Sequence, residues 1–191
     1  MKNRKVYVTT FCGVAVAMNI VLGIITSALG IPLYLDTLGT VLSAAILGPV
    51  PGIIVGALSN IITGLIYSVS DIPFCLVNMA VGLIVGLVAH KVAKINESTD
   101  KKYVFKWSVI ASVAGLAFNV IADPVVGYFY KQYILGQPQE LAQALAKMSA
   151  AATFINAVVS VILVAIIYNA VRPVLIKSHL ITVTNKKNQV A

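Results

Sequence analysis

The sequence predicts an all-α membrane protein: a six-transmembrane-helix bundle with a short second helix and both termini in the cytoplasm. Three observations predict this class. Of 191 residues, 59% are hydrophobic and only 10% are charged, whereas charged residues make up about 25% of an average soluble domain. The apolar runs are long enough for spans of about 20 residues. Lys and Arg gather at one set of connections, as expected for a fixed orientation in the membrane.

Breakers divide the first half of the chain into four helices. We predict a first helix over 7–30, ended by Pro32, and a short second helix over 37–47, because proline removes a donor and disfavours helix in the residue before it. Residues 48–52 (GPVPG) predict a tight turn. A third helix follows over 52–68, and Ser70 or Asp71 caps a fourth helix that runs to about Lys94.

The second half begins after a polar hinge at 96–102 and contains two helices. The fifth is expected over 103–127, with a kink at Pro124. Residues 128–138 predict a tyrosine-rich loop. Residues 139–148 carry apolar residues at helical spacing, which indicates either an amphipathic turn on the membrane surface or an extension of the sixth helix. The sixth helix covers 149–171 and is closed by Pro173.

Charge fixes the expected orientation and the domain organisation. With six spans, every Lys and Arg except Lys131 and Lys147 lies on the side that holds both termini. We therefore expect that side to be cytoplasmic and the protein to be a multi-pass protein of a cell membrane, which the family resemblance given below makes a bacterial plasma membrane. We expect one membrane domain over 1–177 and a polar cytoplasmic tail over 178–191, disordered from Thr182 onward. The net charge of +8 serves as an orientation signal and does not call for nucleic-acid binding.

Single polar residues inside the apolar runs are the candidate functional residues. A polar side chain in hydrocarbon is costly unless it meets a partner or a wet cavity, so several in one small chain indicate a shared polar pocket. The alternative for each asparagine is a hydrogen bond that only joins two helices. Asp36, beside Thr37 at a helix start, is either a cap or a ligand residue. The asparagines lie within helices and the aspartates near helix ends: Asn19, Asn60, Asn78, Asn119, Asn156, Asp71 and Asp123.

Orientation narrows this set. Asn78, Asn119 and Asn156 fall in the outer halves of their helices, with Asp71 and Asp123 just above them, so these five could line one outward-facing cavity. An asparagine amide offers two donors and one acceptor without the desolvation cost of a charge, which suits ligand binding. The roles of Asn19 and Asn60 stay open at this stage. No His, Cys or carboxylate set has metal-ligand spacing, so we expect no metal and no cofactor.

Small residues on the first helix indicate a contact surface. Gly13 and Ala17, four residues apart, form a face that allows another helix to approach closely. The same spacing occurs at Gly52 and Gly56 and at Gly82 and Gly86.

These residues resemble the substrate-binding S component of an energy-coupling factor (ECF) transporter, the vitamin-uptake branch of the ABC importers. The likeness covers nearly the whole chain, and its specific part is the run 35–40 (LDTLGT) leading into 47–56 (LGPVPGIIVG), followed by Asn60. The family has an Ala-xxx-Ala docking motif on its first helix, and Gly13 and Ala17 stand at the matching positions.

The resemblance implies a function and a set of partners. The protein would bind a vitamin or related micronutrient outside and release it inside by toppling in the membrane, when docked to a transmembrane coupling protein and two ATPases. It would not be an enzyme, and the sequence has no phosphate-binding loop of its own. The substrate site would use the outer halves of the last three helices, with Tyr34, Asp71 and Tyr128 at the rim. The full candidate set is Asn60, Asn78, Asn119, Asp123, Asn156, Asp71, Tyr34 and Tyr128.

The identity of the ligand stays open in the sequence. No Lys or Arg lies deep in an outward half-helix, so a neutral or weakly cationic ligand is favoured, and a pyridoxine-like compound is one candidate. Pantothenate is another if Lys131 folds over the site. Two other functions remain as alternatives, namely a small stand-alone membrane carrier and a structural membrane partner. A lipid-modifying enzyme is disfavoured because the acids are scattered, without the paired spacing of a metal site.

Overall fold

The computed structural model describes residues 2–31, 33–178, 180, 181 and 183, and its elements are helical. The long helices are α1 (Lys2–Ala28), α3 (Pro49–Ile66), α4 (Cys75–Leu87), α5 (Lys101–Phe129) and α6 (Gln139–Lys177), and α2 (Leu38–Leu47) is short. A 3₁₀ segment, η1 (Val69–Phe74), precedes α4, while π-helical turns η2 (Val88–Val92) and η3 (Tyr130–Ile134) extend α4 and α5. The predicted all-helical membrane bundle is confirmed.

Five helical stretches of the described chain are long and apolar enough to cross a membrane. The short helix α2 is not one of them, since its 10 residues reach only about 15 Å against a hydrocarbon core of about 30 Å. Nine of its residues, Leu38–Ile46, are buried. The short second helix was predicted, and its place inside the bundle explains why its sequence is largely apolar and lacks a polar, solvent-facing side.

Close helix crossings depend on glycine at several places, including Gly82 and Gly39. A Cβ at Gly82 on α4 would lie 2.4 Å from the carbonyl carbon of Gly52 on α3, and a Cβ at Gly39 on α2 would lie 2.3 Å from the Ala15 carbonyl oxygen on α1. Side chains at these positions would force the backbones apart. The small-residue faces of the third and fourth helices therefore bring these two helices together.

A network of hydrogen bonds centred on Asn19 joins α1, α2 and α3. Asn19, 1% exposed, donates through Nδ2 to Thr40 Oγ1 (3.1 Å) and Ser59 Oγ (2.9 Å), and its Oδ1 accepts from the Gly39 N–H (2.6 Å). The amide is thereby fully paired on three helices. This geometry supports a packing role for Asn19.

Helix boundaries differ from the sequence expectations at Pro49 and Pro173. Only Gly48, with φ of +109°, forms the turn predicted over 48–52, because Pro49 occupies the first turn of α3, where its missing N–H costs nothing. Helix α5 runs past Pro124, and α6 runs past Pro173 to Lys177. The predicted loop over 128–138 was wrong for residues up to Ile134, which continue α5 as η3.

Two further expectations are settled at helix starts. Residues 139–148 belong to a continuous α6, which confirms the extension rather than a separate surface turn. The predicted cap of the fourth helix at Ser70 or Asp71 was wrong, because α4 begins at Cys75 with Phe74 at its N-cap position and no side-chain cap. Ser70 and Asp71 lie in η1, which Ser68 caps by accepting from the Ser70 N–H. Pro32, His179 and most of the predicted tail, including Thr182 and 184–191, lie outside the described residues.

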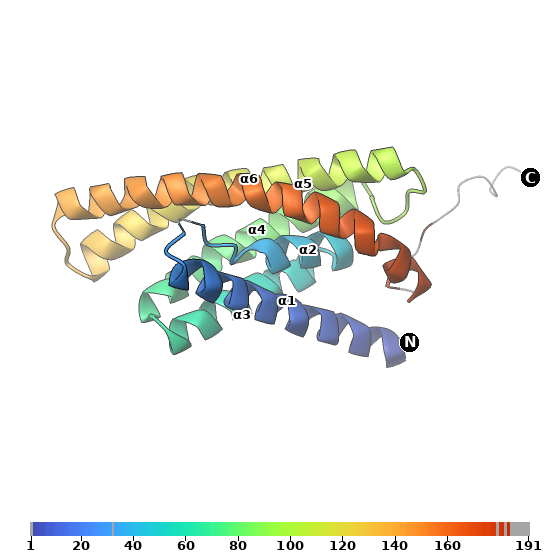
Figure 1. The fold of residues 1–191 in the computed structure, drawn as a ribbon, viewed down its shortest axis with the longest axis horizontal. Helices are drawn as coiled ribbons and strands as arrows, with labels where there is room; N and C mark the ends of the chain where they lie inside the picture. The colour runs from blue at the N-terminus through green and yellow to red at the C-terminus, as the bar shows by residue number, and fades with distance from the viewer. Residues whose placement is uncertain (1, 32, 179, 182, 184–191) are drawn as a thin grey trace, which may run out of the picture.

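The molecule has two distinct ends (Figure 1). The start of α1, the end of α6 and the connection between α4 and α5 lie at one end, here called the termini end. The connection from α1 to α2, the segment η1 and the hairpin between α5 and α6 lie at the other, here called the cavity end. The aspartates of the sequence prediction and Lys131 fall at the cavity end.

Candidate substrate-binding cavity

A cavity of about 820 Å³ opens at the cavity end of the bundle. Its walls come from α1, α3, η1, α4, α5, η3 and α6, and from the connection before α2. A volume of this size is typical of sites for small molecules, which occupy about 300–1,000 Å³. The cavity is therefore large enough for a vitamin-sized ligand.

Seven of the eight predicted substrate-binding residues line this cavity. They are Tyr34, Asn60, Asp71, Asn78, Asn119, Asp123 and Asn156. The eighth, Tyr128, does not contribute to the lining. Its ring packs edge-on against Phe129, with centroids 5.5 Å apart. The neighbouring Gly127 and Tyr130 line the cavity instead.

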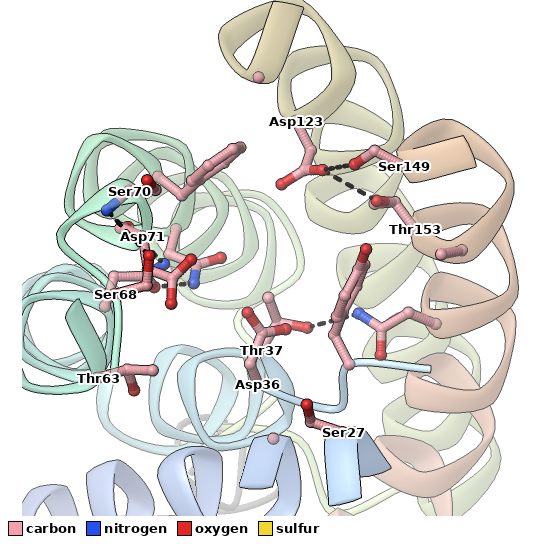
Figure 2. A pocket seen from close by; sticks show the side chains of 18 of the residues that line it. Ser27, Asp36, Thr37, Thr63, Ser68, Ser70, Asp71, Asp123, Ser149 and Thr153 are labelled. Carbon is pink, nitrogen blue, oxygen red and sulfur yellow. Dashed lines mark hydrogen bonds between the residues drawn. The ribbon is translucent and has the colours of Figure 1, made fainter. Parts of the chain in front are cut away.

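Three carboxylates reach the cavity from three different segments. Asp36 comes from the connection before α2, Asp71 from η1 and Asp123 from α5 (Figure 2). Asp123 accepts hydrogen bonds from Ser149 Oγ (2.6 Å) and Thr153 Oγ1 (3.1 Å), both on α6. Lys131 is the one Lys or Arg among the lining residues of the described structure. The cavity is thus rich in acceptors and poor in positive charge.

Asp36 lines the cavity rather than capping α2. Thr37 occupies the N-cap position, and its Oγ1 accepts from Asn156 Nδ2 (3.3 Å) instead of from its own helix. Burial, followed by the negative charge of Asp123, raises the pKa of Asp36 to about 7. Burial and the charge of Asp123 also raise the pKa of Tyr34. At neutral pH Asp36 can therefore serve as a donor or as an acceptor.

Most asparagines of the cavity wall are already paired. Asn78 donates through Nδ2 to Asn60 Oδ1, and Asn60 Nδ2 donates to the Asp71 carbonyl (3.4 Å). Asn156 is fully buried, and its Oδ1 accepts from the Leu35 N–H (2.8 Å), which ties α6 to the connection before α2. These bonds fit the helix-joining alternative as well as a place in the wall.

Asn119 differs from the other asparagines. It lies on α5 and lines the cavity, and only 4% of the residue is exposed. Its side chain makes no hydrogen bond to another described residue, and its amide atoms are absent from the buried polar atoms without a partner. Its two donors and one acceptor consequently face the cavity, where a ligand can use them.

Sequence reasoning missed several residues of the wall. Ser27, Thr63, Ser149, Thr153 and Phe74 line the cavity, together with Tyr67 and Tyr130. Serine and threonine are common in membrane helices, where they bond to their own backbone, so composition alone gives no signal. The register of Ser149 and Thr153 with Asp123 becomes visible only when α5 and α6 are packed together.

Among the described residues, no group of three or more His, Cys, Asp and Glu is placed to hold a metal ion.

Comparison with known proteins assigns the family. A family model described as ECF-type riboflavin transporter, S component, matches residues 3–173. The comparisons with curated proteins and with solved structures gave no match. Membership implies a vitamin-like substrate and the partner subunits of an ECF module, namely ATPases and a transmembrane component. The apolar helices and the matched family together identify a multi-pass membrane transport subunit rather than an enzyme. The chain belongs to the S component family of ECF-type vitamin transporters.

Proposed function

We propose that this subunit captures a neutral, hydroxyl-rich heterocycle in the described cavity, with riboflavin as the first candidate. The observation that carries the proposal is the open amide of Asn119 beside carboxylates from three segments. Hydroxyl groups of a ligand can donate to the carboxylates, and the amide can both donate and accept. The description of the matched family, an S component of riboflavin transporters, supports the flavin as the first compound to test.

Aromatic side chains support the heterocyclic part of the proposal. Tyr34, Tyr67, Phe74 and Tyr130 line the cavity. Such rings offer flat apolar faces on which a ring system can pack, with offset or edge-on geometry. A ligand with one flat ring system and one polar arm would use the aromatic rim and the polar wall at the same time.

A weakly cationic heterocycle, such as a pyridoxine-like compound, is the second candidate. Three acids and one lysine line the cavity, so a positive charge on the ligand would be favoured there. Pantothenate ranks third, because its carboxylate would face Asp36, Asp71 and Asp123 with only Lys131 as a cationic partner.

Uptake by toppling needs a docking surface, which we place on α1. Gly13 and Ala17 are both exposed and share one face of that helix. A Cβ at Gly13 would meet nothing within 4 Å, so the face is open to a partner helix. We propose that the coupling protein packs here. The distribution of Lys and Arg supports a cytoplasmic termini end and a cavity that opens outside before docking.

The test is a binding panel on the full chain purified alone in detergent. Riboflavin, pyridoxine and pantothenate would be titrated separately, with flavin fluorescence or calorimetry as the readout. We expect the tightest binding for riboflavin and a clear loss in Asn119→Ala. Tightest binding for pantothenate would overturn the acceptor-rich interpretation of the cavity. Absence of binding to all three would refute this choice of ligands.

Coupling is tested separately by uptake. Cells that produce the chain with its ECF module should take up the bound vitamin in an ATP-dependent manner. Uptake that persists when the ATPases are inactivated would show a stand-alone carrier instead.

A further inference from the structure

A second pocket, of about 870 Å³, lies at the termini end between α5 and α6. Three cationic residues line it, Lys101 and Lys102 in the first turn of α5 and Arg172 near the end of α6. Its described lining contains no Asp or Glu. The remaining lining residues are Thr99, Phe105, Asn169, Pro173, Ile176 and Val183. This basic pocket is chemically the opposite of the substrate cavity.

Arg172 is incompletely compensated within the described structure. It is 8% exposed, so more than nine-tenths of the residue is buried. Its Nη2 donates to the carbonyls of Ile95 (3.3 Å) and Ser98, but its Nε is buried without a hydrogen-bond partner among the described residues. Burying a guanidinium is costly unless an opposite charge lies close. The pocket therefore favours an anion beside Arg172.

The surroundings place the basic pocket at the level of a membrane surface. Tyr103 directly follows Lys102 on α5 and Trp107 lies about one turn after Tyr103, with ring centroids 6.1 Å apart, and such rings prefer the headgroup region. Phe105, 50% exposed, adds an apolar wall to the pocket. A ligand with both an anionic head and an apolar body matches this combination.

The N-terminus of α5 would contribute less to anion binding than the basic side chains of the pocket. Asp100 already caps α5, because its Oδ1 accepts from the Lys102 N–H (2.9 Å). An anion would thus be held mainly by the ammonium groups of Lys101 and Lys102, both exposed, and by the guanidinium of Arg172. Lysine and arginine are the usual partners of phosphate oxygens.

We propose that this basic pocket binds the headgroup of an anionic phospholipid. Basic pockets between transmembrane helices at the cytoplasmic face are a known way to recognise anionic headgroups. The phosphate chemistry is shared with free inorganic phosphate, but the apolar wall formed by Phe105 and Ile176 favours the lipid. The site is separate from the substrate cavity and does not depend on which vitamin is carried.

The experiment measures lipid retention on the full chain by native mass spectrometry. Purified protein is equilibrated with mixed micelles that contain equal amounts of phosphatidylglycerol and phosphatidylcholine. We expect preferential retention of phosphatidylglycerol. The double variant Lys101→Gln/Lys102→Gln should weaken it roughly 30-fold, since each basic residue near an anionic surface changes binding about fivefold. Lys106→Gln is the matched control, an exposed lysine on the same helix outside the pocket lining.

A third variant and a competition with inorganic phosphate complete the experiment. Arg172→Gln should also weaken retention, but it loses the bonds to Ile95 and Ser98 and could destabilise the fold, so the lysine variants carry the decision. Equal retention of the two lipids, or equal losses in the double variant and the Lys106→Gln control, would overturn the proposal. Displacement of the lipid by millimolar inorganic phosphate would assign the pocket to free phosphate and would overturn the lipid assignment.

Discussion

The two ends of the bundle carry opposite charges in pockets of similar size. The cavity end lines about 820 Å³ with three carboxylates and a single lysine, whereas the termini end lines about 870 Å³ with two lysines and an arginine. The helices between them are mostly apolar, with single polar residues such as Asn119 and Asn156. The charged residues that distinguish the two pockets lie at or near helix ends, because the membrane tolerates few charges elsewhere.

A second contrast lies within the cavity wall. The side-chain amide of Asn156 is hydrogen-bonded to Leu35 and Thr37, whereas the Asn119 amide faces the cavity. The same residue type thus holds the cavity together in one place and is open to a ligand in another. The predictions below separate these uses, beginning with the largest expected effect.

The face of α1 that carries Gly13 and Ala17 should affect transport without affecting vitamin binding. Ala17→Leu adds bulk to the exposed face of α1 proposed for docking. We expect vitamin uptake by cells to be nearly abolished, because close helix approach needs small residues, while vitamin binding by the purified chain stays unchanged. Ala170→Leu, an exposed alanine on α6, is the control for added bulk. Normal uptake by Ala17→Leu would remove the docking assignment.

At the cavity end, Asn119→Ala should weaken vitamin binding about 10- to 100-fold, as expected for loss of one or two ligand hydrogen bonds of about 1–1.5 kcal/mol each. Thermal stability without ligand should change little, since the side chain has no described partner to lose. Calorimetric titration measures the affinity. Asn169→Ala makes the same change at the termini end and should leave vitamin affinity intact. An unaltered affinity in Asn119→Ala would contradict a ligand role.

Asn156→Ala should instead lower stability, by about 1–3 kcal/mol, because the half-buried Leu35 N–H would lose its acceptor. Vitamin binding should fall as a consequence, since the segment that carries Tyr34 and Asp36 would be released from α6. Thermal unfolding in detergent, with and without vitamin, distinguishes this from Asn119→Ala. Full stability together with weak binding would make Asn156 a ligand residue.

We expect substitution of Asp36 to have a smaller, pH-dependent effect on thermal stability. Its pKa is about 7 in the folded protein against 3.8 for an unperturbed carboxyl group, so the folded state binds the extra proton between these values. Stability from this group is therefore lost as pH rises from about 4 to 7. Asp36→Asn should raise the thermal midpoint relative to the native chain, more at pH 8 than at pH 5. A gap that is equal at both pH values would show that Asp36 ionises normally.

Local sequence rules placed the helices but not their ends. Pro49 was interpreted as part of a turn and Pro173 as a stop, yet both lie within helices. In the first turn of α3 the ring of Pro49 suits the helix. Pro173 lies in the last turns of α6, where the interruption that a proline causes is outweighed by packing, which the sequence rule does not include. Pro124 lies within α5, as predicted, and its kink stays a prediction.

The candidate site was predictable in its members but not in their roles. Buried polar residues are expensive in a membrane, so most of those singled out along the chain line the cavity. Whether each amide is paired depends on which helix faces it. Asp36 shows the same limit, because only the packed structure reveals that Thr37 holds the cap position and leaves the carboxylate in the cavity.

The sequence by itself determined the membrane class, the short second helix and the set of polar residues that meet in the bundle, because apolar length and the cost of burying polar groups act on each segment separately. The tertiary structure decided which asparagines are tied and which one is open. It also brought Lys101, Lys102 and Arg172 together from two helices that are distant in the chain. Those outcomes depend on contacts between segments, and hydrogen bonds and charges act only over the short distances that packing creates.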